Sequence, residues 1–315
     1  MQMTSSSNNT SRESLVTTTF GDGVLTYLKN KHRGGVSGGK GTRYEDVFAV
    51  VEAAEHACRL NVACGAVSLE AQVPLYFIDD LVVREHGNAV EHCFQLKNSP
   101  SVTWGSGEKC IADDCIKQLM LSAAAGQPAP KVVLVTSDGD CAASLQASVP
   151  KELSGKVEVR WFPWAERSNV MCQLWPAAVE AVAWLSKYEA PNFQQVSDVL
   201  TVLIGVWSSQ DGNIVVSALI EKARELSPTL IRPLVADDAV QQALTDEFKN
   251  ALAAIDNFSY SIVKGFFVWD FSFPNGSTQQ GIFAQDCLSD SFKKFQARVV
   301  KLQPTTFEEI EEELL

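Results

Sequence analysis

An acidic pair and a Gln-x-Lys triplet are the residues of this sequence that best suit chemistry. Asp79 and Asp80 end the stretch "VPLYFIDD", and Gln95 and Lys97 end the stretch "VEHCFQLK". Carboxylate and amide oxygens are hard ligands for a divalent ion such as Mg²⁺, and a lysine can stabilise an attacking hydroxide or a charged phosphate. If these side chains meet in the folded chain, they have the groups needed to hydrolyse a phosphodiester.

A β-hairpin is predicted to bring these residues together. Residues 73–83 and 90–97 are rich in β-branched and aromatic side chains, and Gly87-Asn88 between them favours a two-residue turn. In that register His86 pairs with Ala89, which assigns a partner to every residue further along the two strands.

The register predicts which aspartate can take part. Asp80 lies opposite Gln95, and because successive side chains of a strand point to opposite faces, Asp80, Gln95 and Lys97 share one face. Asp79 falls opposite Leu96 on the other face. A bulge, or a loop with an odd number of residues, would select Asp79 instead. We therefore predict Asp80 as the acid, with Asp79 as the alternative.

Helices and further strands are predicted around this hairpin. Residues 42–60 have apolar side chains at helical spacing, and Thr42 with Glu45 three residues later forms a capping box. Later segments predict in order a helix, two strands and a helix, over residues 108–125, 131–137, 156–164 and 172–189. Alternating helices and strands indicate an α/β fold with a mixed sheet flanked by helices.

Three regions are expected along the chain. Residues 1–14 are rich in Ser, Thr and Asn and are predicted to be a disordered tail. Residues 15–190 form the α/β domain. Residues 191–315 form a smaller α+β region that would bind a partner or regulate the domain. It ends in "FEEIEEELL", which could dock on a basic partner or stay solvated.

The glycine-rich stretch "HRGGVSGGKGT" nearly matches a phosphate-binding loop. Gly41 stands where that loop needs Ser or Thr, and no convincing strand precedes the stretch. The alternatives are a solvated loop or a flexible contact to the DNA backbone. Contacts to phosphate would come from the basic residues that cluster here, which are Lys29, Lys31, Arg33, Lys40 and Arg43.

Composition limits the remaining possibilities. The net charge of −12 opposes nonspecific attraction to DNA or to an anionic membrane, so any DNA contact must be local. No apolar run could cross a bilayer, and the eight cysteines contain no C-x-x-C pair, which suggests a cytoplasmic protein. Asp113 and Asp114 are expected on the solvated face of a helix. A zinc site is a weaker alternative, with candidate ligands His86, His92, Cys93, Cys110 and Cys115.

The stretches "GTRYEDVFAVVEAA", "YFIDDLVV" and "CFQLKNS" together resemble the PD-(D/E)xK nucleases, in the branch whose motif is D…QxK. More narrowly, Gly41-x-x-Tyr44-Glu45, Asp79-Asp80 and Gln95-Leu96-Lys97 are similar to the endonuclease domain of the CD-NTase-associated effectors of bacterial antiphage defence. The same type of domain occurs in the nuclease subunit of Lamassu systems. The resemblance covers about residues 15–190.

This resemblance implies a restriction-endonuclease-like fold and a set of site residues. Asp80 would be the metal-binding acid, Gln95 the second polar ligand and Lys97 the catalytic lysine. Glu45 would complete the site as a third metal ligand, and it could also serve as a helix cap. The cofactor would be Mg²⁺, with Mn²⁺ as a substitute, and the substrate would be double-stranded DNA. The region after residue 190 does not resemble the cyclic-oligonucleotide sensor of those effectors, which favours a Lamassu-type subunit controlled by an SMC-like ATPase.

The leading hypothesis is therefore a metal-dependent DNA endonuclease effector, activated by partner release or by oligomerisation. Because one copy with a charge of −12 should bind DNA poorly, several copies of the basic segment would have to act on one duplex. The rival hypotheses are a noncatalytic scaffold, which a Lys97 turned away from Asp80 would favour, and a regulator that binds a nucleoside triphosphate.

Overall fold

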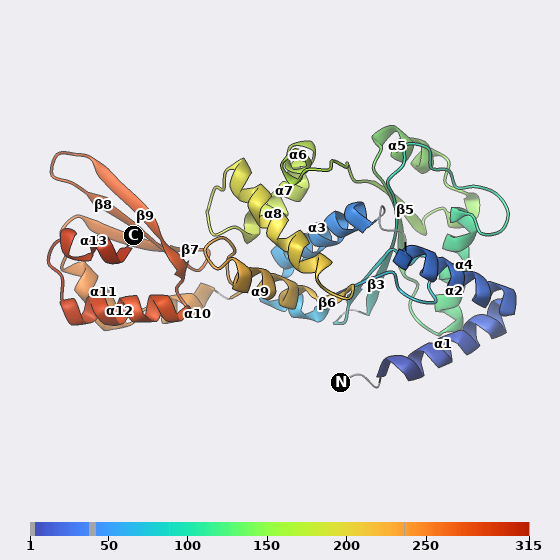
Figure 1. The fold of residues 1–315 in the computed structure, drawn as a ribbon, viewed down its shortest axis with the longest axis horizontal. Coiled ribbons are helices and arrows are strands. Elements are labelled where there is room, and N and C mark those ends of the chain that lie inside the picture. The colour runs from blue at the N-terminus through green and yellow to red at the C-terminus, as the bar shows by residue number, and fades with distance from the viewer. Residues whose placement is uncertain (1–3, 38–41, 88, 236, 315) are drawn as a thin grey trace. The chain divides into compact units, whose positions relative to one another are not determined.

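The computed structural model describes residues 4–37, 42–87, 89–235 and 237–314. Their Cα positions divide into two compact units that alternate along the chain (Figure 1). Unit 1 comprises residues 1–53, 65–176 and 207–216, and unit 2 comprises residues 54–64, 177–206 and 217–315. The division therefore differs from the single boundary expected near residue 190. Among the described residues, no helix combines the length and apolar character needed to cross a bilayer.

Unit 1 is built on a mixed six-stranded sheet in the order β5-β4-β3-β2-β1-β6. Strands β1 to β3 and β6 pair antiparallel, whereas β3, β4 and β5 are parallel to one another. The strands are β1 (Val67–Ala71), β2 (Leu81–Glu85), β3 (Val90–Lys97), β4 (Lys131–Thr136), β5 (Val157–Trp161) and β6 (Asn213–Val215). The predicted α/β class is confirmed, although β6 comes from the region that was expected to be a separate domain.

The hairpin has the predicted register. Leu81 pairs with Phe94 and Glu85 with Val90, which is the pairing that a turn centred on residues 87–88 requires. Asn88 itself lies outside the described residues. The prediction of a strand from residue 73 was wrong: residues 73–80 form turns, and the preceding strand is β1. Gln72 and Leu75, with φ of 50° and 62°, interrupt the extended backbone between β1 and β2.

Helices cover both faces of the sheet. Neighbouring side chains of β3 point to opposite faces, so each face has its own contacts. Phe94 packs edge-on against Phe48 of α3 (Thr42–Leu60), with ring centroids 5.1 Å apart. Cys93 belongs to the cluster on the other face, which includes Cys115 of α4 (Ile111–Ala124) and Leu145 of α5 (Gly139–Ala147). The helices predicted at residues 42–60 and 108–125 are thus present and fix the two faces of the hairpin.

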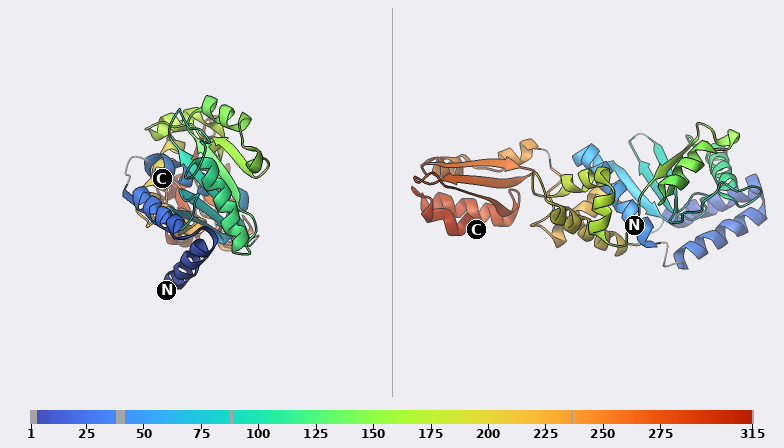
Figure 2. Two further views of the ribbon diagram at one scale, coloured as in Figure 1. Left: turned by 90° about the vertical axis from the view of Figure 1, so that its right-hand side faces the viewer. Right: turned by 90° about the horizontal axis from the view of Figure 1, so that it is seen from above.

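The N-terminal segment forms two helices that lie side by side, α1 (Thr4–Phe20) and α2 (Asp22–Ser37) (Figure 2). The expectation of a disordered tail over residues 1–14 is therefore wrong from residue 4 onward. Val16 of α1 and Leu28 of α2 are buried in one apolar cluster with Phe77 and Leu121. Two apolar anchors thus hold a segment whose composition is otherwise polar.

Two short helices replace the single helix predicted at residues 172–189. They are α6 (Ser168–Leu174) and α7 (Pro176–Leu185). The break falls at Pro176, since proline lacks the backbone N–H that a helix interior needs and suits the first turn of a new helix. Two short 3₁₀ helices, η1 (Asn61–Ala66) and η2 (Lys151–Leu153), complete the connections.

Unit 2 contains a three-stranded antiparallel sheet in the order β7-β8-β9. Its aromatic core includes Phe248, Phe267, Phe292 and Phe295. The elements of the C-terminal region are α8 (Phe193–Ser208), α9 (Val216–Leu226), α10 (Asp237–Gln242), α11 (Asp246–Ala253), β7 (Phe258–Val263), β8 (Phe266–Ser272), β9 (Thr278–Asp286), α12 (Asp290–Leu302) and α13 (Glu308–Leu314). The expected mixture of helices and strands in this region is present.

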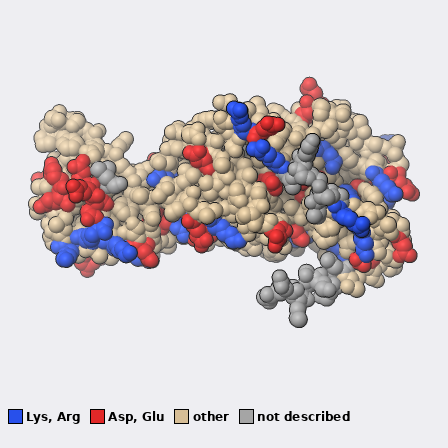
Figure 3. Space-filling view, in the orientation of Figure 1, with Lys and Arg blue, Asp and Glu red and all other residues tan. Residues whose placement is uncertain are grey.

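The acidic tail forms helix α13, which packs against the rest of unit 2. Ile310 and Leu314 are buried in its core, and Arg298 of α12 pairs with Glu313 at 2.5 Å. Glu308, Glu309 and Glu312 are exposed, and Figure 3 shows acidic side chains gathered over this helix. The apolar face of the tail is therefore packed, and docking of its acidic face on a basic partner stays a prediction.

Candidate active site

Asp80 lies directly before β2, and three groups from the end of β3 surround its carboxylate. The backbone N–H of Leu96 donates to Asp80 Oδ2 at 2.7 Å, and Gln95 Nε2 donates to the same oxygen. Lys97 Nζ lies 3.8 Å from Asp80 Oδ2. The hairpin thus brings together Asp80, Gln95 and Lys97, as its register requires.

Glu45 enters the same site from the first turn of α3. Gln72 Nε2 donates to Glu45 Oε2 at 3.2 Å and to Asp80 Oδ1 at 3.4 Å, so one amide group lies between the two carboxylates. We call Glu45, Gln72, Asp80, Gln95 and Lys97 the Asp80 cluster. The side chain of Thr42 lies outside the described residues, so the predicted capping box is not described. The side chain of Glu45 is described, and its carboxyl group lies near that of Asp80.

Burial and like charge shape the electrostatics of the Asp80 cluster. Desolvation and, to a smaller extent, the neighbouring Asp80 carboxylate raise the pKa of Glu45 to about 7, although Gln72 and Lys97 act against the shift. A carboxyl group with a raised pKa favours its neutral form until a cation offsets the repulsion. A cation bound between the two carboxylates would therefore favour the charged form of Glu45.

Asp79 belongs to a second polar group, which Lys31 joins to Gln95 of the Asp80 cluster. It is 2% exposed, and Lys31 Nζ of α2 lies 3.3 Å from its Oδ1. Burial raises the pKa of Asp79 to about 6, although the Lys31 ammonium opposes this shift. Lys31 also contacts Asp114 Oδ2 at 3.0 Å and donates to the carbonyl oxygen of Phe77. Asp79 is thus an ion-pair partner of Lys31, and Asp80 alone of the pair faces Lys97.

This second group corrects two expectations from the sequence. Lys31 was grouped with residues that contact DNA, but its side chain is 19% exposed and lies between Asp79 and Asp114. Asp114 was expected on a solvated face, but it is 5% exposed and accepts hydrogen bonds from the hydroxyl of Tyr27 at 3.0 and 3.2 Å.

The other basic residues near the glycine-rich stretch have different surroundings. Lys29 pairs with Glu13 at 2.8 Å in a partly exposed ion pair. Arg33 and Arg43 are exposed, and Lys40 lies outside the described residues. Lys29, Arg33 and Arg43 thus remain candidates for contact with phosphates. Residues 22–37 form helix α2 rather than a strand, which is not the structure that a phosphate-binding loop requires.

The donor set at the Asp80 cluster suits a hard divalent ion. Among the described residues, no three His, Cys, Asp or Glu side chains come close enough to hold a metal ion together. Two carboxylates, of Glu45 and Asp80, are nevertheless sufficient for Mg²⁺, which keeps several water molecules and takes further oxygens from a phosphate substrate. Glu45 and Asp80 are therefore the residues that would hold such an ion.

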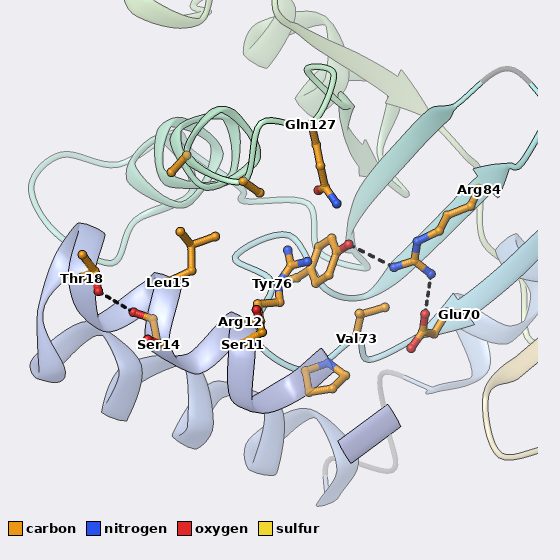
Figure 4. A pocket seen from close by; sticks show the side chains of 13 residues that line it. Ser11, Arg12, Ser14, Leu15, Thr18, Glu70, Val73, Tyr76, Arg84 and Gln127 are labelled. Atoms are coloured by element: carbon orange, nitrogen blue, oxygen red, sulfur yellow. Dashed lines mark hydrogen bonds and ion pairs between the residues drawn. The ribbon is translucent and has the colours of Figure 1, made fainter. Parts of the chain in front are cut away.

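The cluster is accessible from solvent at Lys97, whose side chain is 38% exposed. A cavity of about 970 Å³ lies elsewhere in unit 1, and none of the five cluster residues lines it. Figure 4 shows this cavity, where Arg84 donates to the Tyr76 hydroxyl at 3.1 Å and pairs with Glu70. Arg12 lies over the Tyr76 ring, 3.8 Å from its centroid. The paired charges at Arg84 indicate a structural role for this region.

The sequence interpretation did not assign three residues to these polar contacts, which are Gln72, Tyr27 and Asp114. Gln72 follows the strand that was missed, and Tyr27 lies in a helix that was not predicted. Asp114 did carry a signal, because its spacing to Gln118 and Leu121 places it on one stripe of α4, and both of those residues are buried. A helical period applied to Asp114 would have placed it inside the protein.

Comparison with known proteins adds no further information about the site. No protein-family model, no curated protein and no solved structure matches this chain.

Proposed function

We propose that this protein is a metal-dependent endonuclease that cleaves double-stranded DNA and has a restriction-endonuclease-like fold. The observation that supports the proposal most strongly is the Lys97 ammonium 3.8 Å from the Asp80 carboxylate, beside a second carboxylate, Glu45, that shares Gln72 with it. These are the groups that the resemblance to the D…QxK nucleases assigns to catalysis.

The architecture of unit 1 suits that fold. Its sheet is mixed, the Asp80 hairpin lies in the middle of the strand order, and helices cover both faces. The catalytic side chains come from two strand ends and one helix terminus, so rigid elements hold them in place. Such support keeps reacting groups within a narrow range of positions, as phosphodiester hydrolysis requires.

Each residue of the Asp80 cluster has a distinct role in this proposal. Asp80 and Glu45 would hold Mg²⁺ or Mn²⁺, which polarises the phosphate and lowers the pKa of a water molecule when it is bound. Lys97 would stabilise negative charge on the phosphate. The Leu96 N–H and the Gln95 amide orient Asp80 through their hydrogen bonds to Oδ2. Gln72 fixes the separation of the two carboxylates.

Substrate and control follow from exposure and charge. Lys97 is reachable from solvent, as an enzyme acting on a polymer needs. Lys29, Arg33 and Arg43 would contact the DNA backbone, but a net charge of −12 opposes binding by a single copy. We infer that activity requires oligomerisation or release by a partner, as in a bacterial antiphage defence complex with an SMC-like ATPase. A cytoplasmic location belongs to the same proposal.

The test is cleavage of plasmid and linear duplex DNA in Mg²⁺ and Mn²⁺ by wild type, Asp80→Ala and Lys97→Ala. Each substitution should lower the rate by at least about 100-fold, because each removes a group that stabilises charge in the transition state. Lys156→Ala is the matched control, since Lys156 is exposed and its Nζ donates to the backbone carbonyl of Glu152 within its own segment. Equal rates for Lys97→Ala and Lys156→Ala would refute the assigned site.

The position of Lys97 also bears on the scaffold alternative. A noncatalytic subunit would have no need to hold a partly exposed lysine beside Asp80, and a Lys97 turned away from Asp80 would have favoured it. The observed separation of 3.8 Å supports the enzyme instead.

A further inference from the structure

The orientation of the Gln95 amide is determined by its two neighbours. Gln95 Nε2 donates to Asp80 Oδ2, and Gln95 Oε1 accepts from Lys31 Nζ at 3.3 Å. A carboxylate only accepts hydrogen bonds and an ammonium only donates them, so the reverse orientation would place like groups together on both sides. Gln95 is 3% exposed, so these contacts are buried.

This orientation conflicts with the role of Gln95 as a metal ligand. A cation bound at Asp80 would need the amide oxygen, yet the amide nitrogen faces Asp80 and the oxygen faces Lys31. Lys31 is itself held from several directions, by Asp79 at 3.3 Å, by Asp114 at 3.0 Å and by the carbonyl of Phe77. Gln95 therefore cannot turn its oxygen toward Asp80 while it keeps its hydrogen bond to Lys31.

We propose that Lys31 is a positioning residue that lowers the cation affinity of the Asp80 cluster by holding the Gln95 oxygen away from Asp80. This inference rests on the proposed function, because it concerns the same metal site. Withdrawal of Lys31 frees the amide to rotate, and Gln95 then supplies its oxygen to the cation. Lys31 acts through Gln95 and does not itself touch the substrate.

Helix α2 is suited to transmit such a change. Two residues along an α-helix correspond to a rotation of about 200°, so Lys29 and Arg33 lie on the side of α2 opposite Lys31. Lys29 and Arg33 are exposed, whereas Lys31 points inward. A phosphate backbone or an acidic partner that contacts the outer side of α2 would therefore act on the same helix that positions Gln95.

The test is calorimetric titration of the full-length protein with Mn²⁺ alone. Removing Lys31 also removes a positive charge, which by itself would favour a cation. The decisive variant is therefore Lys31→Met combined with Asp114→Asn, which leaves the local charge unchanged, and Tyr27 can still donate to the new amide. This double variant should bind Mn²⁺ about tenfold more tightly than wild type, which corresponds to one hydrogen bond. Lys31→Met alone measures the added effect of charge.

Asp80→Ala separates the possible outcomes. If this variant loses Mn²⁺ binding while the double variant binds no better than wild type, the role of Lys31 is refuted and the metal site stands. If wild type and the double variant both lack binding that depends on Asp80, the metal site of the proposed function and the role of Lys31 are refuted together. Tighter binding by the double variant without DNA cleavage would keep the role of Lys31 and refute the nuclease.

A measurement on the wild type covers the case in which the double variant does not fold. Saturating Mn²⁺ should weaken the contact between Lys31 and Gln95, so backbone amides of α2 should exchange with deuterium faster than in the metal-free protein. A lysine with a merely structural role would leave this exchange unchanged or slow it. Unchanged or slower exchange over residues 22–37 would overturn the inference.

Discussion

At the scale of single residues, the Asp80 cluster gathers groups that destabilise one another in the absence of a cation. Glu45 has a pKa of about 7 because it is buried and lies near Asp80. Its ordinary value is 4.5, so between pH 4.5 and 7 the folded protein binds more protons than the unfolded chain. The stability that protonated Glu45 contributes is therefore complete below pH 4.5 and is lost as the pH rises through 7.

Glu45→Gln should accordingly stabilise the metal-free protein at pH 8 and not at pH 4. The gain in free energy of unfolding should reach up to about 2 kcal/mol, since a shift of one pKa unit corresponds to about 1.4 kcal/mol and solvent screens part of it. Gln72 can still donate to the new amide oxygen. Urea unfolding in EDTA at both pH values measures the difference, and an equal effect at pH 4 and pH 8 would contradict the assigned cause.

At the scale of elements, local patterns predicted those parts of the site that local geometry determines. The hairpin register follows from the turn at residues 87–88, so Asp80, Gln95 and Lys97 could be placed together before the structure was known. The helix with Glu45 follows from its apolar period. These features depend only on spacing within one or two neighbouring segments.

The contacts that escaped prediction join segments far apart in the sequence. Lys31 reaches Asp114 across 83 positions, and Gln72 joins Glu45 across 27. The helical spacing of Asp114 indicates that it is buried but not which residue it contacts, and nothing local to Lys31 signals a buried partner. The turns at residues 73–80 were missed because Gln72 and Leu75 adopt positive φ although neither is a glycine.

The C-terminal sheet offers a test of packing at the same scale. A Cβ atom at Gly281 of β9 would lie 2.5 Å from the Trp269 ring of β8, and Trp269 is buried. Gly281→Ala should therefore lower the free energy of unfolding by about 1–3 kcal/mol, because the indole has no room to move. The measurement is the midpoint of urea-induced unfolding, followed by tryptophan fluorescence.

Gly205 in α8 is the matched control. A Cβ atom there meets nothing within 4 Å, so Gly205→Ala should leave stability unchanged or raise it by up to about 1 kcal/mol through helix propensity. If the two substitutions had the same effect, the packing of Trp269 against β9 would be wrong.

At the scale of the whole molecule, the net charge opposes the DNA binding that the proposed activity requires. The net charge of −12 repels DNA, while the proposed site must receive a DNA phosphate at Lys97. Several copies acting together would multiply the few basic contacts from Lys29, Arg33 and Arg43 and overcome this repulsion. The activity per protein chain should therefore increase with protein concentration.

The most direct test of the central claim is the rate of plasmid cleavage by wild type and Asp80→Ala over a series of protein concentrations in Mn²⁺, with EDTA as the control. The proposal predicts cleavage that requires the metal, increases more than proportionally with protein concentration and is lost in Asp80→Ala. Cleavage that persists in EDTA or in Asp80→Ala would contradict the claim that the Asp80 cluster is a metal-dependent nuclease site.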